Sequence, residues 1–176
     1  MKPISLRAQL IIVAAGYAAV LAFAAVLVAG RYVLYVSHPQ DVAAAGGMYA
    51  AGDLFLEMFI FCMLLVPTFL LAWVIRNSEE LYTGYAKILV GLSLTAPICL
   101  GVLSIPAVGQ GPMVVGEILM SRLVGSPFVI AGLAFSRLLA RFDRAKRLTF
   151  YALMIEILTL VFMVAGFLFL ARSHGG

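Results

Sequence analysis

Long apolar stretches constrain this chain of 176 residues more than any other feature of its sequence. A helix needs about 20 predominantly apolar residues to cross the hydrocarbon layer of a bilayer. Within that layer every backbone N–H and C=O must be hydrogen-bonded to the protein itself, which leaves helices or a closed barrel. Barrel strands are short and alternate in hydrophobicity, whereas these stretches are continuous. We therefore predict an all-α membrane protein, a bundle of about five transmembrane helices. The predicted helices cover about residues 10–36, 53–75, 85–105, 114–139 and 148–171.

The composition favours the same class of protein. Hydrophobic residues make up 64% of the chain and charged residues 11%, whereas a soluble domain is about half apolar and about a quarter charged. At this length we expect a single transmembrane domain over residues 1–176. The first apolar stretch follows Lys2 and Arg7, as in a secretory signal, but it continues through Gly30. Because that length spans a bilayer, we expect an uncleaved helix.

The distribution of Lys and Arg predicts the orientation of the helices. With the N-terminus inside and the C-terminus outside, nine of the 12 basic residues fall on the inner side, as the positive-inside rule requires. We therefore expect a multi-pass protein of a cell membrane, of the bacterial inner-membrane type, with a cytoplasmic N-terminus. The net charge of +4 comes from residues that flank apolar segments, so it does not indicate nucleic-acid binding.

A basic stretch at residues 137–147 follows the fourth predicted helix. We expect it to continue that helix out of the membrane, with Asp143 and Arg147 paired one turn apart. Its charges set the orientation, and a second interpretation is contact with anionic lipid headgroups. The basic residues concerned are Arg137, Arg141, Arg144, Lys146 and Arg147.

Ionisable residues near the outer helix ends form the first candidate site, because an ionisable side chain within a membrane is costly and marks a functional hypothesis. The cluster consists of Arg31, Asp53, Glu57, Glu117 and Arg122. We predict that at least one of the arginines pairs with one of the acids, since an unpaired charge there would be expensive. The cluster is either a set of ion pairs that holds helices together or a polar site that binds a cation or a small polar solute from outside.

Glu156 is the most deeply placed ionisable residue. It lies about eight residues into the fifth predicted helix, which is roughly 12 Å. We predict that its side of the helix faces the bundle and that its partner is Lys87 or a hydroxyl of a neighbouring helix. It would act as a proton or cation relay, or as a buried hydrogen-bonding group. The small and polar residues on the same side are Thr149, Ala152, Thr159, Met163 and Gly166.

Three further patterns concern packing. A connection at residues 37–51 is long enough to cap one face. Proline frees the carbonyl one turn earlier and kinks a helix, and the prolines within predicted helices are Pro67, Pro97 and Pro127. Small residues every four positions favour close helix contacts, and these rows are Ser93, Pro97 and Gly101 on the third helix and Gly132, Ser136 and Ala140 on the fourth.

Familiar signatures of catalysis and cofactor binding do not occur in the sequence. GxSxG, HExxH and GxxxxGK[ST] are all missing. Cys62 and Cys99 form no CxxC pair, and His38 and His174 fall outside the predicted helices. We therefore expect no metal and no cofactor.

Two functional classes remain. The first is a non-enzymatic protein: a small carrier, a ligand-binding protein or a helper subunit of a membrane assembly. Its partners would be the bilayer and either other membrane subunits or a second copy of the chain. The alternative is a membrane-embedded enzyme that acts on a lipid-linked substrate through outer carboxylates such as Asp53 and Glu57. The sequence favours the first class, because no catalytic motif accompanies these acids.

Overall fold

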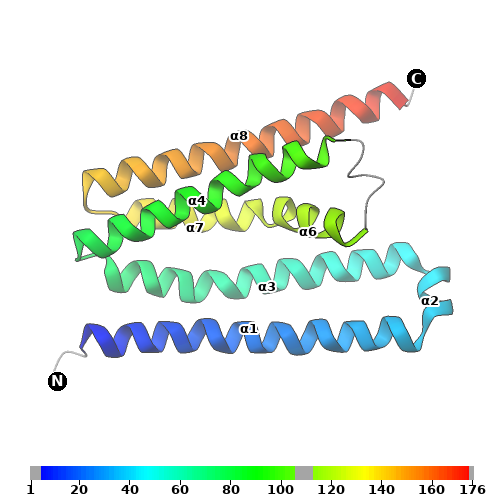
Figure 1. The fold of residues 1–176 in the computed structure, drawn as a ribbon, viewed down its shortest axis with the longest axis horizontal. Coiled ribbons are helices and arrows are strands. Elements are labelled where there is room, and N and C mark those ends of the chain that lie inside the picture. Colours follow the sequence, from blue (N-terminus) through cyan, green and yellow to red (C-terminus); the bar gives the residue numbers. More distant parts are fainter. Residues whose placement is uncertain (1–4, 106–112, 175–176) are drawn as a thin grey trace. The chain divides into compact units, whose positions relative to one another are not determined.

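A computed structural model describes residues 5–105 and 113–174, and nearly all of these residues are helical. No strand occurs in the part of the chain that is described. In chain order the helices are α1 (Leu6–Ser37), α2 (Pro39–Ala44), α3 (Gly46–Ile75), α4 (Glu79–Leu103), α6 (Met113–Val124), α7 (Ser126–Leu139) and α8 (Asp143–His174), as Figure 1 shows.

Four of these helices are long and apolar enough to cross a membrane: α1, α3, α4 and the Asp143–Gly166 part of α8. The pair formed by α6 and α7 provides a fifth span if it is counted as one bent helix. Large apolar side chains cover the outside of these helices, and such a surface needs a hydrocarbon solvent. The prediction of an all-α membrane bundle with about five spans is confirmed. Examples of side chains more than half exposed are Ile12, Val26, Phe55, Ile88 and Phe162.

The chain divides into two compact units, Met1–Val74 and Ile75–Gly176. Nothing tests the prediction of a single domain, so it stays a prediction. In the first unit α1 and α3 run antiparallel and α2 joins them (Figure 1). The long connection expected at residues 37–51 is instead short, because α2 begins at Pro39 and α3 already begins at Gly46.

Side-chain contacts between α1 and α3 follow one another along the hairpin of the first unit. The Tyr17 hydroxyl and Thr68 Oγ1 are hydrogen-bonded at 2.8 Å. Further along, the rings of Phe23 and Phe59 meet edge to face with centroids 6.5 Å apart. Near the connection, an ion pair described below joins the two helices. Polar contacts at both ends and an aromatic contact between them therefore fix the register of the hairpin.

In the second unit α4 and α8 run in the same direction, and α6 and α7 run opposite to them (Figure 1). Each of α4, α7 and α8 buries a strip whose members alternate by four and three residues, the spacing of left-handed helix packing. Most strip residues are small, so the helices can approach closely. The buried strips are Tyr82, Ala86, Leu89, Ser93 and Ala96 on α4, and Ala145, Thr149, Ala152, Glu156 and Thr159 on α8. The third strip is Ser126, Leu133, Ser136 and Ala140, with Val129 half-buried between them.

The four-residue row predicted on α4 is only partly right. Ser93 is buried, whereas Pro97 and Gly101 are exposed. A strictly four-residue spacing drifts around a helix of 3.6 residues per turn, and the alternating strip replaces it. On α7 the row of Gly132, Ser136 and Ala140 is buried as predicted.

The bend between α6 and α7 follows from Pro127. Proline has no N–H to continue the ladder of the preceding turn, and here it lies in the first turn of α7. The segments Ile118–Val124 and Ser126–Leu139 meet there at 46°. By contrast, α3 and α4 continue through their internal prolines, Pro67 and Pro97. Of the three predicted kinks, the one at Pro127 is the one at which the helix breaks.

The prediction that residues 137–147 continue the fourth helix is wrong. Helix α7 ends at Leu139, Ala140 is extended (φ −63°, ψ 122°), and α8 begins at Asp143. Ala140 is 5% exposed, so the chain turns where a small side chain can be buried. Asp143 in the first turn of α8 interacts favourably with the positive end of the helix dipole. The apolar periodicity of the sequence did not predict this turn, because charged residues lie on both sides of it.

Candidate functional site

Arg122 and Glu156 form the most deeply buried ion pair in the described part of the chain. Arg122 lies in the last turn of α6, where a cation is favoured by the negative end of the helix dipole. Glu156 belongs to the buried strip of α8. The break after α6 leaves Ser126, at the start of α7, close to the guanidinium. The bend between α6 and α7, the dipole of α6 and the buried strip of α8 therefore position the two side chains of this pair.

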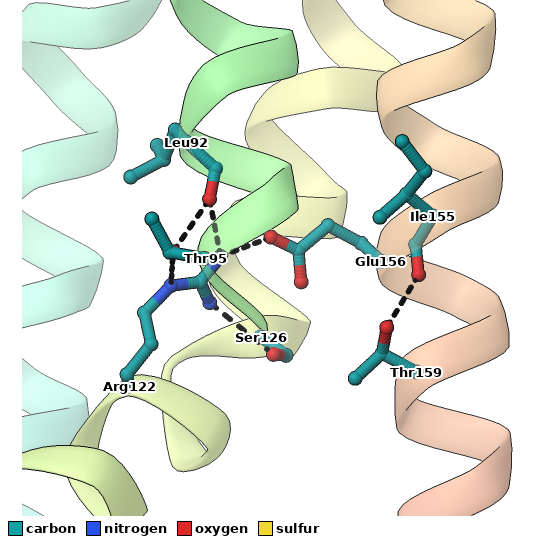
Figure 2. A network of polar contacts seen from close by, with 7 residues as sticks. All are labelled: Leu92, Thr95, Arg122, Ser126, Ile155, Glu156 and Thr159. Atoms are coloured by element: carbon teal, nitrogen blue, oxygen red, sulfur yellow. Dashed lines mark hydrogen bonds and ion pairs between the residues drawn. The ribbon is translucent and has the colours of Figure 1, made fainter. Parts of the chain in front are cut away.

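Neutral acceptors hold the Arg122 guanidinium on several sides (Figure 2). Its Nε donates to Thr95 Oγ1 at 2.8 Å, and one terminal nitrogen donates to Ser126 Oγ at 3.4 Å. The other terminal nitrogen donates to the Leu92 carbonyl at 3.1 Å and to Glu156 Oε1. Three helices and the start of a fourth thus meet at this one side chain, with α4 supplying two of the acceptors.

The Glu156 carboxylate is completely buried, whereas the Arg122 side chain is 16% exposed. Only Oε1 of Glu156 contacts the guanidinium, so the pair uses one carboxylate oxygen. Oε2 has no hydrogen-bond partner among the described residues, and the same holds for the buried hydroxyl of Ser93. Leu92 O and Glu156 Oε1 bind the same nitrogen, which places the backbone next to Ser93 close to Glu156. The site therefore contains unsatisfied buried oxygens, which are costly in an apolar interior.

The sequence prediction for Glu156 is half right. Its strip faces the bundle as expected: Thr149, Ala152 and Thr159 are buried with it. Towards the end of the strip Met163 is half-buried and Gly166 is exposed. The expected partner was wrong, because Glu156 pairs with Arg122 and not with Lys87, which is exposed. The sequence places Arg122 in the outer cluster because it lies near the start of the fourth predicted helix. That assignment treats the fourth helix as straight and does not take the bend at Pro127 into account.

The outer cluster is represented by Arg31 and Asp53 in the first unit. Arg31 Nε lies 2.5 Å from Asp53 Oδ1, so the predicted ion pair is present. The hydroxyl of Tyr35 donates to Asp53 Oδ2, and a terminal nitrogen of Arg31 donates to the Tyr49 carbonyl at 2.8 Å. The guanidinium also lies over the rings of Tyr35 and Tyr49, 5.1 and 4.7 Å from their centroids, a favourable cation–π geometry. Both carboxylate oxygens of Asp53 are engaged, which is the arrangement of a structural lock.

The other two acids of the predicted cluster are Glu57 and Glu117. Glu57 is half-buried and forms no ion pair with a described residue. Glu117 lies in α6, and its side chain falls outside the described residues. Hence Arg31 is paired with Asp53 within the first unit, and Arg122 is paired with Glu156 within the second.

The basic residues predicted to contact lipid lie on both sides of the turn between α7 and α8. Arg137 donates to the Lys146 carbonyl at 3.1 Å and stacks over Phe150, 4.6 Å from its centroid. Arg141 donates to Asn77 Oδ1 at 2.9 Å, which joins this turn to the connection before α4. The predicted pair of Asp143 with Arg147 is wrong, because Asp143 pairs with Lys146 at 4.0 Å. Arg144 and Arg147 are exposed and form no ion pair with a described residue.

Within residues 5–105 and 113–174, no three His, Cys, Asp or Glu side chains converge as metal ligands would. The fold and the site define an α-helical, multi-pass membrane protein with an ion pair buried among its helices. Compared with known proteins, the chain matches no family model, no curated protein and no solved structure.

Proposed function

We propose that this chain is a non-enzymatic membrane protein, a small carrier or ligand-binding protein whose site is the Arg122–Glu156 pair. One observation carries the proposal: Glu156 is fully buried, yet one of its carboxylate oxygens has no partner among the described residues. A buried ionisable group within a membrane is most often part of a substrate, ion or proton pathway. An incomplete pair at such a position is able to accept another ligand.

A pair that served only to hold helices together would be better satisfied. Arginine can bind a carboxylate through two parallel hydrogen bonds, which adds both energy and geometric specificity. The Arg31–Asp53 pair of the same chain illustrates the satisfied case, since Tyr35 takes the second oxygen. Among the described residues, Glu156 has no such second donor. The contrast between the two pairs supports a structural role for Asp53 and an exchangeable role for Glu156.

The enzymatic alternative receives less support from the same contacts. It required outer carboxylates free to act on a lipid-linked substrate, and Asp53 has both oxygens occupied. A general acid or base must reach the proton it transfers. Because Asp53 is occupied, Glu57 would have to act without this second acid, which lies one turn before it on α3. We therefore do not propose an enzyme.

A solute screen by thermal unfolding tests the proposed function. A ligand that binds the folded protein raises its unfolding temperature. The purified protein in nanodiscs is heated with small anions, cations and zwitterions in turn. We expect at least one class to stabilise the wild type and to leave the Arg122→Gln/Glu156→Gln double variant unchanged. Lys87→Gln, which removes an exposed charge of α4, is the matched control and should respond as the wild type does. No response to any class would overturn the proposal.

We also propose that the basic turn between α7 and α8 contacts anionic lipid headgroups. Support comes from Arg144 and Arg147, which are exposed, because clustered basic residues beside a membrane helix attract anionic lipid. Nanodiscs containing phosphatidylglycerol should raise the unfolding temperature above that in neutral phosphatidylcholine. The Arg144→Gln/Arg147→Gln variant should lose most of this difference, and an unchanged difference would refute the contact.

A further inference from the structure

We propose that the second unit binds one small monocarboxylate at Arg122 together with one proton at Glu156. This inference rests on the proposed function, and it names the class of solute and its coupling to protons. The Glu156 carboxylate already occupies the Arg122 guanidinium. A solute carboxylate of the same charge and shape would take the place of this internal one.

The guanidinium can keep its position when Glu156 leaves it. Thr95, Ser126 and the Leu92 carbonyl all accept hydrogen bonds from it and carry no charge. Figure 2 shows these acceptors on α4 and at the start of α7, apart from Glu156 on α8. The cation is therefore positioned by groups that do not need to move. Its planar fork is suited to a carboxylate, and its side chain is 16% exposed, so the protein does not enclose it completely.

Charge balance links the solute to a proton. In the resting state the charges of Arg122 and Glu156 cancel. A hydronium ion transfers its proton to Glu156 Oε2: one O–H bond of hydronium breaks, one O–H bond forms on the carboxyl group, and a neutral carboxyl and a water molecule result. Arg122 then lacks a counter-charge at a site of low polarity, where the attraction for an anion is strong. One monocarboxylate restores neutrality, whereas a dianion or a cation would leave a net charge.

On α4, α7 and α8, the other charged residues lie five or more residues along the helix from the groups that contact Arg122. On α6, Glu117 is five residues before Arg122, and its side chain lies outside the described residues. On α4, Lys87 is six residues from Ser93, about 9 Å along the helix, and it is exposed. On α7, Arg137 is eleven residues from Ser126, roughly 16 Å away along the helix. Within α8 the nearest charged residue is Arg147, nine residues before Glu156. Tyr82 and Tyr85 are eleven and eight residues before Ser93, Cys99 is four residues after Thr95, and Tyr151 is five residues before Glu156.

The decisive experiment measures acetate binding as a function of pH. Protein in nanodiscs is titrated with acetate between pH 5 and pH 8, and the unfolding temperature and the apparent Kd are recorded. For the wild type we expect the Kd to rise about tenfold per pH unit once Glu156 is ionised, because one proton binds with each anion. Glu156→Gln mimics the protonated state, so it should bind acetate with little dependence on pH. Arg122→Gln/Glu156→Gln should not bind, and Lys87→Gln should behave as the wild type.

The controls separate failure of this inference from failure of the proposed function. Methylammonium and succinate are tested beside acetate. Stabilisation by methylammonium or succinate alone, abolished in the double variant, would overturn the monocarboxylate and keep the proposed function. Acetate binding without a pH dependence in the wild type would overturn the proton coupling. If neither these three solutes nor the wider solute panel changes the unfolding temperature, both this inference and the proposed function are overturned. If Glu156→Gln unfolds during purification, the pH dependence of acetate binding to the wild type still tests the proton coupling, and the double variant still tests the site.

Discussion

At the scale of single residues, two arginines that the sequence placed in one predicted cluster have different contacts. Arg31 pairs with an acid whose second oxygen is held by Tyr35, and it stacks on two tyrosine rings. Arg122 pairs with Glu156, whose second oxygen has no partner among the described residues. The first pair is satisfied and partly exposed, whereas the second is incomplete and buried. The number of satisfied oxygens, and not the presence of a salt bridge, separates the structural pair from the candidate site.

Removing one partner of the buried pair should destabilise the protein more than removing both. Glu156→Gln or Arg122→Gln alone leaves a charge without its counter-ion, and each should lower the free energy of unfolding by about 3 kcal/mol. The double variant has no buried charge and should lie within about 1 kcal/mol of the wild type. Chemical unfolding in detergent measures the three values. Additive losses in the double variant would show that the two side chains do not interact.

The two acids of α3 offer a matched pair of substitutions in the first unit. Asp53→Asn removes the charge that Arg31 and Tyr35 contact, and it should lower the free energy of unfolding by about 1–2 kcal/mol, a modest value because the pair is partly exposed. Glu57→Gln, one turn later, changes no ion pair between described residues and should have an effect below about 0.5 kcal/mol. Equal effects of the two substitutions would contradict the assigned role of Asp53.

At the scale of helices, spacing decides which faces meet. The buried strips of α4 and α8 both alternate by four and three residues, and Leu89, Leu133 and Ala152 form the apolar core between α4, α7 and α8. Small residues dominate the strips, so the helices pack closely and leave little room for a larger side chain. Glu156 occupies a position in its strip that would normally hold a small or apolar residue. Its burial is thus a consequence of helix packing and not of its own chemistry.

A larger side chain in the strip of α8 should therefore be costly. Ala152 is 0% exposed, and Ala152→Leu should lower the free energy of unfolding by about 1–3 kcal/mol through overpacking. Val161→Leu adds a methylene on the exposed side of the same helix and should change it by less than about 0.5 kcal/mol. Thermal or chemical unfolding in detergent distinguishes the two. A neutral Ala152→Leu would mean that α4 and α8 are separated by more space than the strip indicates.

At the scale of the whole molecule, the count of spans controls the topology. Four helices qualify as spans, and α6 with α7 provides a fifth if the bent pair is counted as one span. An odd number puts the two termini on opposite sides of the membrane, which is the arrangement that the distribution of Lys and Arg predicts. Within the second unit, the hydrogen bond between Arg141 and Asn77 places two connections at the same end, both of which the prediction assigns to the cytoplasm.

Reporter fusions test this topology directly. We expect fusions at Asn77, Asp143 and the N-terminus to report the cytoplasm, and fusions at Gly46 and Gly176 to report the outside. The reason is that this arrangement leaves nine of the 12 basic residues inside. A cytoplasmic signal at both Gly176 and the N-terminus would mean that α6 and α7 re-enter the membrane without crossing it.

The sequence by itself determined the class of the fold. Apolar stretches of membrane-spanning length specify helices, because the bilayer leaves no other partner for the backbone. The last residues of the long helices were predicted to within three residues, whereas α3 and α4 begin seven and six residues before their predicted starts. The Arg31–Asp53 pair was also predictable, since opposite charges at one depth of a hairpin must compensate each other. The alternating strip of α8 was visible in the sequence and predicted that Glu156 faces its neighbours.

Only the tertiary structure decided which partner Glu156 has. The choice of Arg122 over Lys87 depends on the bend before Pro127 and on the packing of α6 and α7 against α4 and α8. Apolar periodicity carries no information on either, because it specifies which face of a helix is buried but not which residues of other helices lie at the same depth. The turn at Ala140 was missed for a related reason: a short break between two helices is set by contacts from other helices and leaves little trace in hydropathy.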